Sequence, residues 1–216
     1  PLPVPFGPHL MVSLQDEWHR LRTALRALDP QTTFVLVFAA VAVVLQFTIG
    51  DRSLFRVHLA DALPPSWQGL GAWARWFGMQ GLLGFVVPVI ALRLLFAQPP
   101  REMGLGVGNW RLAVGLAALY LPLVAVGTWV LSDGGAFQQQ YPHYRPATRQ
   151  WSVFLIYEAL FLFYWIGWEY LWRGFVVFGT AHTLGLYAMF VQALPFAALH
   201  VSKPWPEAVL SIVGGI

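Results

Sequence analysis

The chain has 216 residues, of which 57% are hydrophobic and only 11% are charged, and its mean hydropathy is +0.59. A soluble domain carries about 25% charged residues, so this composition excludes an ordinary soluble globular protein. The net charge is +3, but the arginines are scattered beside apolar runs rather than clustered. We therefore expect membrane lipid headgroups, and not nucleic acid, as their counterions. The chain contains no cysteine, which excludes disulfides and thiolate chemistry within it.

The N-terminal segment, residues 1–30, is expected to precede a membrane domain, residues 31–216. Residues 1–10 are proline-rich, and Met11 is the expected natural start. Residues 13–28 have the apolar spacing of an amphipathic helix, which we expect to lie in the headgroup region. A solvated connector with accidental periodicity is the alternative. The apolar face would carry Leu14, Trp18, Leu21, Leu25 and Leu28, with Arg20, Arg22 and Arg26 elsewhere.

Three uncharged runs predict the first three transmembrane helices, because each approaches the ~20 residues that a helix needs to cross the hydrocarbon core. They are residues 32–50, 76–92 and 112–131. The glycine- and proline-rich loop 98–111 separates the second span from the third. Residues 132–150 are polar and are expected to form a loop in water. The Lys and Arg residues beside the spans slightly favour a cytoplasmic N-terminus.

Residues 151–201 contain only three formally charged side chains, and as a helix they would extend ~75 Å, enough to cross twice. The small and polar residues of 179–185 predict the turn. Lys203-Pro204-Trp205-Pro206 is expected to end the fifth span, and residues 207–216 to begin a sixth. The predicted fold is therefore all-α: a polytopic membrane helix bundle with five full transmembrane helices, the start of a sixth and an N-terminal amphipathic helix.

Ionisable side chains inside the fourth predicted span are candidates for chemistry, because a charge within a membrane costs from a few to more than about ten kcal/mol. Glu169 and Arg173 are spaced i, i+4, so they can pair on one helix face. A neutralising link between helices explains this pair equally well. His200, on the returning arm, is expected at a similar depth, and a carboxylate and an imidazole together can hold and deprotonate a water molecule. Glu158 is expected nearer the membrane surface, outside the chemistry.

Two short stretches carry a resemblance to a known family. Glu169-Tyr170-Leu171-Trp172-Arg173, followed by Phe196-Ala197-Ala198-Leu199-His200, resembles the first two motifs of the CPBP intramembrane proteases, the CAAX prenyl protease and bacteriocin-processing family. Their pattern is Glu-Glu-x-x-x-Arg, then Phe-x-x-x-His, then His-x-x-x-Asn or Asp. The resemblance covers roughly residues 98–216. It implies an intramembrane endopeptidase in which Glu169 and His200 activate water and Arg173 fixes the glutamate.

The chain departs from the family pattern at two places. Trp168 stands where the family has its first glutamate, and the sequence ends at Ile216, before the helix expected to bear the third motif. The substrate implied by the resemblance is a peptide or a membrane protein. The alternative, favoured by Trp168, is a non-catalytic membrane scaffold or a bacteriocin self-immunity protein of the same fold.

Other hydrolytic sites and cofactors have weaker sequence support. The chain has neither a His-Glu-x-x-His zinc motif nor a Gly-x-Ser-x-Gly elbow. Glu169 and His200 supply only two metal ligands, too few for a strong zinc prediction. We therefore expect no cofactor, with a metal at these two residues as the alternative. The expected location is the cell membrane, as a multi-pass protein of the bacterial inner membrane.

Overall fold

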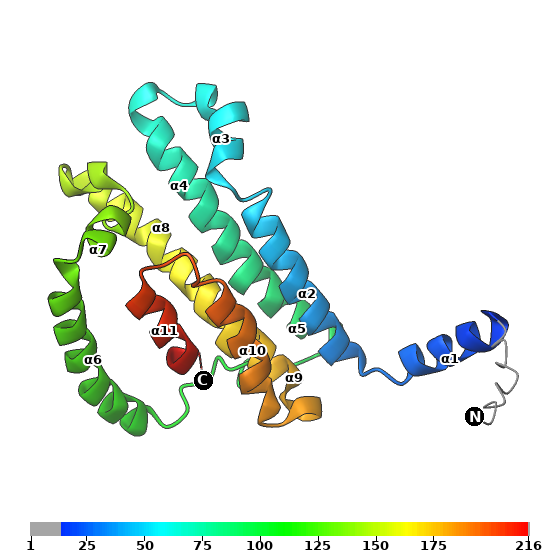
Figure 1. The fold of residues 1–216 in the computed structure, drawn as a ribbon. Coiled ribbons are helices and arrows are strands. Elements are labelled where there is room, and N and C mark those ends of the chain that lie inside the picture. Colours follow the sequence, from blue (N-terminus) through cyan, green and yellow to red (C-terminus); the bar gives the residue numbers. More distant parts are fainter. Residues whose placement is uncertain (1–13, 216) are drawn as a thin grey trace, which may run out of the picture.

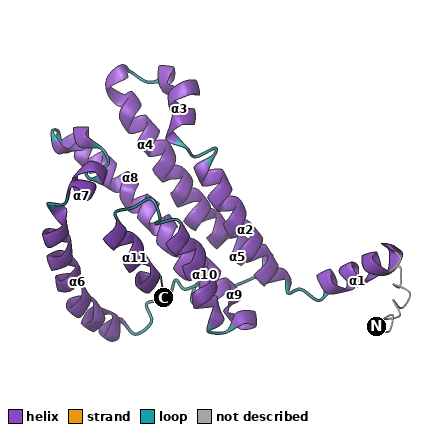
Figure 2. Ribbon diagram, viewed as in Figure 1, coloured by secondary structure: helices purple, strands orange, loops and turns teal. Residues whose placement is uncertain are grey.

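The structure is a computed structural model that describes residues 14–215, so the expected start at Met11 lies outside the described residues. Within that range the regular elements are all helical (Figure 2). The α-helices are α1 (Leu14–Arg26), α2 (Pro30–Phe47), α3 (Arg52–His58), α4 (Pro65–Gly81), α5 (Val87–Leu95), α6 (Trp110–Ser132), α7 (Gly135–Gln140), α8 (Trp151–Glu169), α9 (Val177–Leu184), α10 (Tyr187–Ala198) and α11 (Trp205–Gly214). Two 3-10 segments, η1 (Ala60–Ala62) and η3 (Arg145–Thr148), and two π-helical segments, η2 (Leu82–Val86) and η4 (Tyr170–Val176), complete them.

Four helical stretches are long and apolar enough to cross a membrane, which is compatible with a multi-pass membrane protein. They are Pro30–Phe47, Pro65–Leu95, Trp110–Ser132 and Trp151–Leu184. The second runs without a break through α4, η2 and α5, and the fourth through α8, η4 and α9. These stretches correspond to the first four predicted spans. The second begins eleven residues before the uncharged run 76–92, and the other ends of the three uncharged runs differ by at most three residues.

The fifth predicted span is too short to be a complete crossing, so the prediction of five full spans is not confirmed. The structure turns at Gly185, the last residue of the predicted turn segment 179–185. Gly185 adopts a φ of 55°, a conformation that favours glycine. Helix α10 then has only 12 residues, or ~18 Å of rise. Pro195 removes a backbone donor near its end. The chain turns after Ala198, and α11 returns beside α10 as the second arm of a hairpin (Figure 1).

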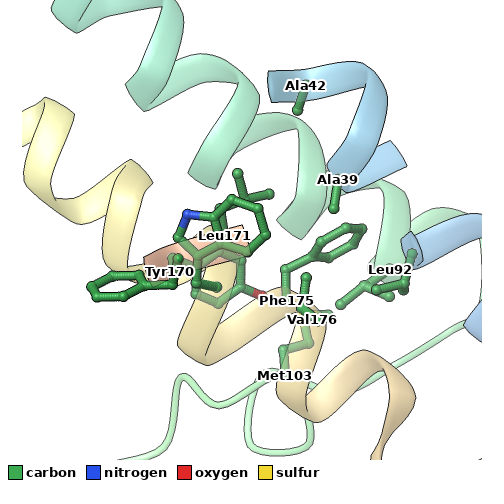
Figure 3. Close-up of a cluster of buried hydrophobic side chains, with 11 residues drawn as sticks. Ala39, Ala42, Leu92, Met103, Tyr170, Leu171, Phe175 and Val176 are labelled. Atoms are coloured by element: carbon green, nitrogen blue, oxygen red, sulfur yellow. The ribbon is translucent and has the colours of Figure 1, made fainter. Parts of the chain in front are cut away.

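Helices α2, α5 and α10 and the π-helical segment η2 enclose the main apolar core around the π-helical segment η4. Phe175 is fully buried at its centre and projects toward Ala39 of α2, with Leu92 of α5 beside it (Figure 3). Met103, from the loop after α5, closes the lower side of this cluster. The predicted glycine-rich loop therefore contributes to the core rather than only joining two spans.

A close crossing of two helices positions the region that bears Glu169. Gly84 of η2 faces the backbone carbonyl of Gly167 on α8, and Gly167 faces the backbone carbonyl of Gln80. A Cβ at either glycine would overlap these carbonyl oxygens. Small residues let membrane helices approach this closely, and this crossing lies two residues before Glu169.

Helices α1 and α6 lie outside the packed part of the bundle. Helix α6 has no buried residue, and it stands at the edge of the molecule (Figure 1). Helix α1 extends away from the bundle at the N-terminal end of α2, with Trp18, Leu21 and Leu25 exposed. Its apolar face has no protein partner among the described residues, so its predicted position in the headgroup region stays a prediction.

Candidate functional site

Glu169 and Arg173 form the predicted ion pair at the junction of α8 and η4. The Arg173 guanidinium contacts the Glu169 carboxylate directly. It also donates a hydrogen bond to the backbone carbonyl of Gly214 in α11 and lies 4.6 Å from the centre of the Phe196 ring. The two side chains remain 34% and 38% exposed. Arg173 therefore joins three helices at one point, which agrees with the alternative interpretation of the pair as a neutralising link between helices.

The π-helical geometry of η4 begins immediately after Glu169. A π-helical turn is a rare distortion that is frequent at functional sites. Gly174 permits it locally, because a Cβ there would overlap the Tyr170 ring. The side chains of Tyr170 and Trp172 are buried, and their hydroxyl and indole N–H have no partner in the described chain. The segment thus holds unsatisfied donors beside the Glu169–Arg173 pair.

His200 lies just beyond the end of α10, and one of its ring nitrogens is hydrogen-bonded to the backbone. Its Nδ1 is 2.7 Å from the backbone carbonyl oxygen of Phe196. A carbonyl only accepts, so Nδ1 carries the proton, and in the neutral ring Nε2 keeps its lone pair. The imidazole stacks on the Phe196 ring at 4.7 Å and meets the edge of Trp168 at 5.8 Å. This fixed tautomer leaves Nε2 free to accept a proton or a hydrogen bond.

Trp168 and Phe196 stand between the ion pair and His200. The two rings are 5.8 Å apart; Trp168 contacts His200, and Phe196 contacts both His200 and Arg173. Trp168 lies near the middle of the 34-residue stretch Trp151–Leu184, and its contact with His200 brings the end of α10 to this part of the helix.

The contacts of the described residues include no direct link between Glu169 and His200. No direct hydrogen bond or ion pair within residues 14–215 joins Glu169 to His200. Two apolar surface grooves are lined by residues of α1, α2 and α9 and include neither side chain. A cavity shared by Glu169 and His200 therefore stays a prediction. Glu158 is exposed and lies eleven residues before Glu169, toward the outer end of α8.

A polar cluster near His200 was missed by the sequence reasoning. Lys203 and Glu207 form an i, i+4 ion pair at 3.6 Å, and both contact the hydroxyl of Tyr141. The spacing of Lys203 and Glu207 was a visible signal, but we interpreted Lys203 only as the end of a span. Tyr141 carried no signal, because it lies more than sixty residues away in the chain.

Metal ligation has no further support within the described part of the chain, where no group of three or more His, Cys, Asp or Glu side chains converges. Searches against protein-family models, curated proteins and solved structures find no match for this chain. The two short motifs and the contacts of Glu169, Arg173 and His200 are therefore the features that point to a function.

Proposed function

We propose that the chain is an intramembrane endopeptidase of the bacterial inner membrane, of the CPBP type, that hydrolyses a peptide or membrane-protein substrate. The observation that supports the proposal is that the Phe196 ring contacts both the His200 imidazole and the Arg173 guanidinium, and that this guanidinium contacts the Glu169 carboxylate. Nδ1 of His200 is bonded to the Phe196 carbonyl, which leaves Nε2 as the ring nitrogen that can accept. Membrane lipid would surround the bundle, and no cofactor is invoked.

The proposed reaction uses water as the nucleophile. Glu169 accepts a proton from a water molecule while the His200 Nε2 holds the same water, and the resulting hydroxide adds to the carbonyl carbon of the scissile bond. The C–N bond then breaks, and the protonated Glu169 returns its proton to the leaving amine. Arg173 holds the carboxylate in position between turnovers through their direct contact.

The test compares cleavage of membrane proteins between a strain that lacks the gene and the same strain complemented with variants of it. The deletion strain is complemented with the wild type, Glu169→Gln or Glu158→Gln, and new termini in the membrane fraction are identified by mass spectrometry. Glu158→Gln is the matched control, because it makes the same change at an exposed position of the same helix. We expect cleavage with the wild type and the control, and cleavage at least ~100-fold slower with Glu169→Gln.

Trp168 favours a second candidate, a non-catalytic scaffold or a bacteriocin self-immunity protein. Its indole contacts the His200 ring, where the family resemblance would place an additional carboxylate. If Glu169→Gln complements the deletion as fully as the wild type does, the endopeptidase proposal fails and the scaffold takes its place.

We further propose that α1 lies in the headgroup region of the membrane. Its exposed apolar side chains and the free Arg22 and Arg26 on the same short helix support this position. A spin label at residue 25 should be broadened by an acyl-chain relaxation agent. Broadening by an aqueous agent alone would contradict this placement.

A further inference from the structure

The turn between α10 and α11 is associated with two charged side chains. Lys203 lies in the turn, three residues after His200, and Glu207 lies in the first turn of α11. Both side chains are partly buried, and a charge removed from water is stable only when it is paired and hydrogen-bonded. The Lys203–Glu207 ion pair at 3.6 Å satisfies part of this requirement.

Tyr141 supplies the remaining partner from a distant part of the chain. Its hydroxyl donates to the Glu207 carboxylate, at 2.8 Å from Oε2 and 3.0 Å from Oε1, and accepts from the Lys203 ammonium at 3.1 Å. Burial, together with the neighbouring Glu207, raises the pKa of Tyr141 above its usual 10.0. The phenol therefore stays protonated and remains a donor to Glu207 at physiological pH. We call Tyr141, Lys203 and Glu207 the Tyr141 bridge.

The segment that bears Tyr141 is itself fastened to the rigid part of the bundle. The Tyr141 ring lies 4.6 Å from the His143 ring, and His143 lies 5.7 Å from Trp73 on α4. Trp73 is buried between α4 and α8 and packs on Tyr157 at 6.0 Å. The Tyr141 bridge therefore links the α10–α11 turn to a fixed wall rather than to a free loop.

Backbone hydrogen bonds connect the α10–α11 turn to His200. The Lys203 N–H donates to the His200 carbonyl at 2.9 Å, and the His200 N–H donates to the Ala197 carbonyl at 3.0 Å. We propose that Tyr141 is a positioning residue, which holds the α10–α11 turn through Lys203 and Glu207 and so keeps the His200 ring against Trp168. The catalytic consequence depends on the endopeptidase function proposed above, whereas the structural consequence does not.

The experiment measures how firmly the turn is held, with a reporter independent of catalysis. The chain contains no cysteine, so Ser202→Cys places its single thiol on an exposed part of the turn. In this background Tyr141→Phe removes only the hydroxyl. Tyr144→Phe is the matched control, because Tyr144 lies in the same segment and its hydroxyl has no hydrogen bond to another described side chain. The rate of reaction with a water-soluble thiol reagent is measured in liposomes.

We expect Tyr141→Phe to raise this rate by roughly tenfold, the scale of a lost hydrogen bond to a charged group, and Tyr144→Phe to leave it unchanged. Glu207→Gln should also raise the rate, and adding it to Tyr141→Phe should produce little further increase, because both variants break the same bridge. An unchanged rate in Tyr141→Phe, or an equal rise in Tyr144→Phe, overturns the proposal.

Two further measurements, the NMR resonance of the His200 ring and the kcat for cleavage, distinguish a positioning role of Tyr141 from a merely structural one. In Tyr141→Phe the His200 ring resonance, assigned with His200→Gln, should move away from that of the Nδ1-bonded tautomer, and kcat should fall with KM unchanged. If the wild type cleaves nothing, the proposed function fails, but the thiol rates and the resonance still decide the role of Tyr141. If cleavage occurs and neither signal changes in Tyr141→Phe, the positioning role alone is wrong.

Discussion

Gly167→Ala tests how the helix crossing positions the site. The added Cβ would overlap the backbone carbonyl oxygen of Gln80 on the opposing helix, and Gly84 faces the Gly167 carbonyl in return. Neither obstacle is a side chain that can rotate away, so α8 must move from η2. Overpacking of this kind costs about 1–3 kcal/mol, and the alanine returns roughly 0.5–1 kcal/mol by restricting the unfolded backbone.

Because both obstacles are backbone atoms, the overpacking cost lies in the upper part of its range, about 2–3 kcal/mol. The net loss of about 1–2.5 kcal/mol corresponds to a fall in Tm of roughly 2–10 °C for a domain of this size. The measurement is thermal unfolding in detergent, followed by far-UV circular dichroism. Gly78→Ala is the matched control, because Gly78 lies in the opposing helix α4 and a Cβ there meets no atom within 4 Å. The Tm of this variant should stay equal or rise. A Tm for Gly167→Ala at or above that of the wild type would refute the close crossing and the placement of Glu169 that depends on it.

Two further predictions concern charges. Arg173→Met should lower the free energy of unfolding by about 1–3 kcal/mol, less than for a fully buried pair because both partners are partly exposed. Adding Glu169→Gln should recover part of this loss, because it removes the carboxylate left without its partner. A double variant that is no more stable in thermal unfolding than Arg173→Met would contradict this prediction. Burial, and secondarily Lys203, lowers the pKa of His143 from 6.5. The folded state then binds fewer protons than the unfolded chain, so stability is full above pH 6.5 and declines as the pH falls through 6.5 toward the lowered pKa. His143→Phe should flatten this part of the Tm against pH curve, and an unchanged curve would refute the assignment.

Much of the architecture was predictable because hydrophobicity and helical spacing are local properties. Uncharged runs of spanning length indicated the first three spans, and the sparsely charged stretch 151–201 indicated the fourth. Each corresponds to a helical stretch that is long and apolar enough to cross a membrane, although the second begins eleven residues before its uncharged run. The i, i+4 spacing of Glu169 and Arg173 predicted their ion pair, because neighbours on one helix face meet whatever surrounds the helix. Counting residues on either side of the turn also predicted similar levels for Glu169 and His200, and that level stays a prediction.

The rest depended on contacts between helices, which composition does not encode. A short apolar helix and a complete span have similar hydropathy. Only the structure, in which α10 packs against Trp168 and α11, shows that the predicted fifth span ends after the 12 residues of α10. Tyr141 meets Glu207 across 66 residues of chain, and Gly167 meets Gln80 across the α4–α8 crossing. Spacing along one helix determines its own faces, whereas the crossing angles and shapes of several helices decide which faces touch.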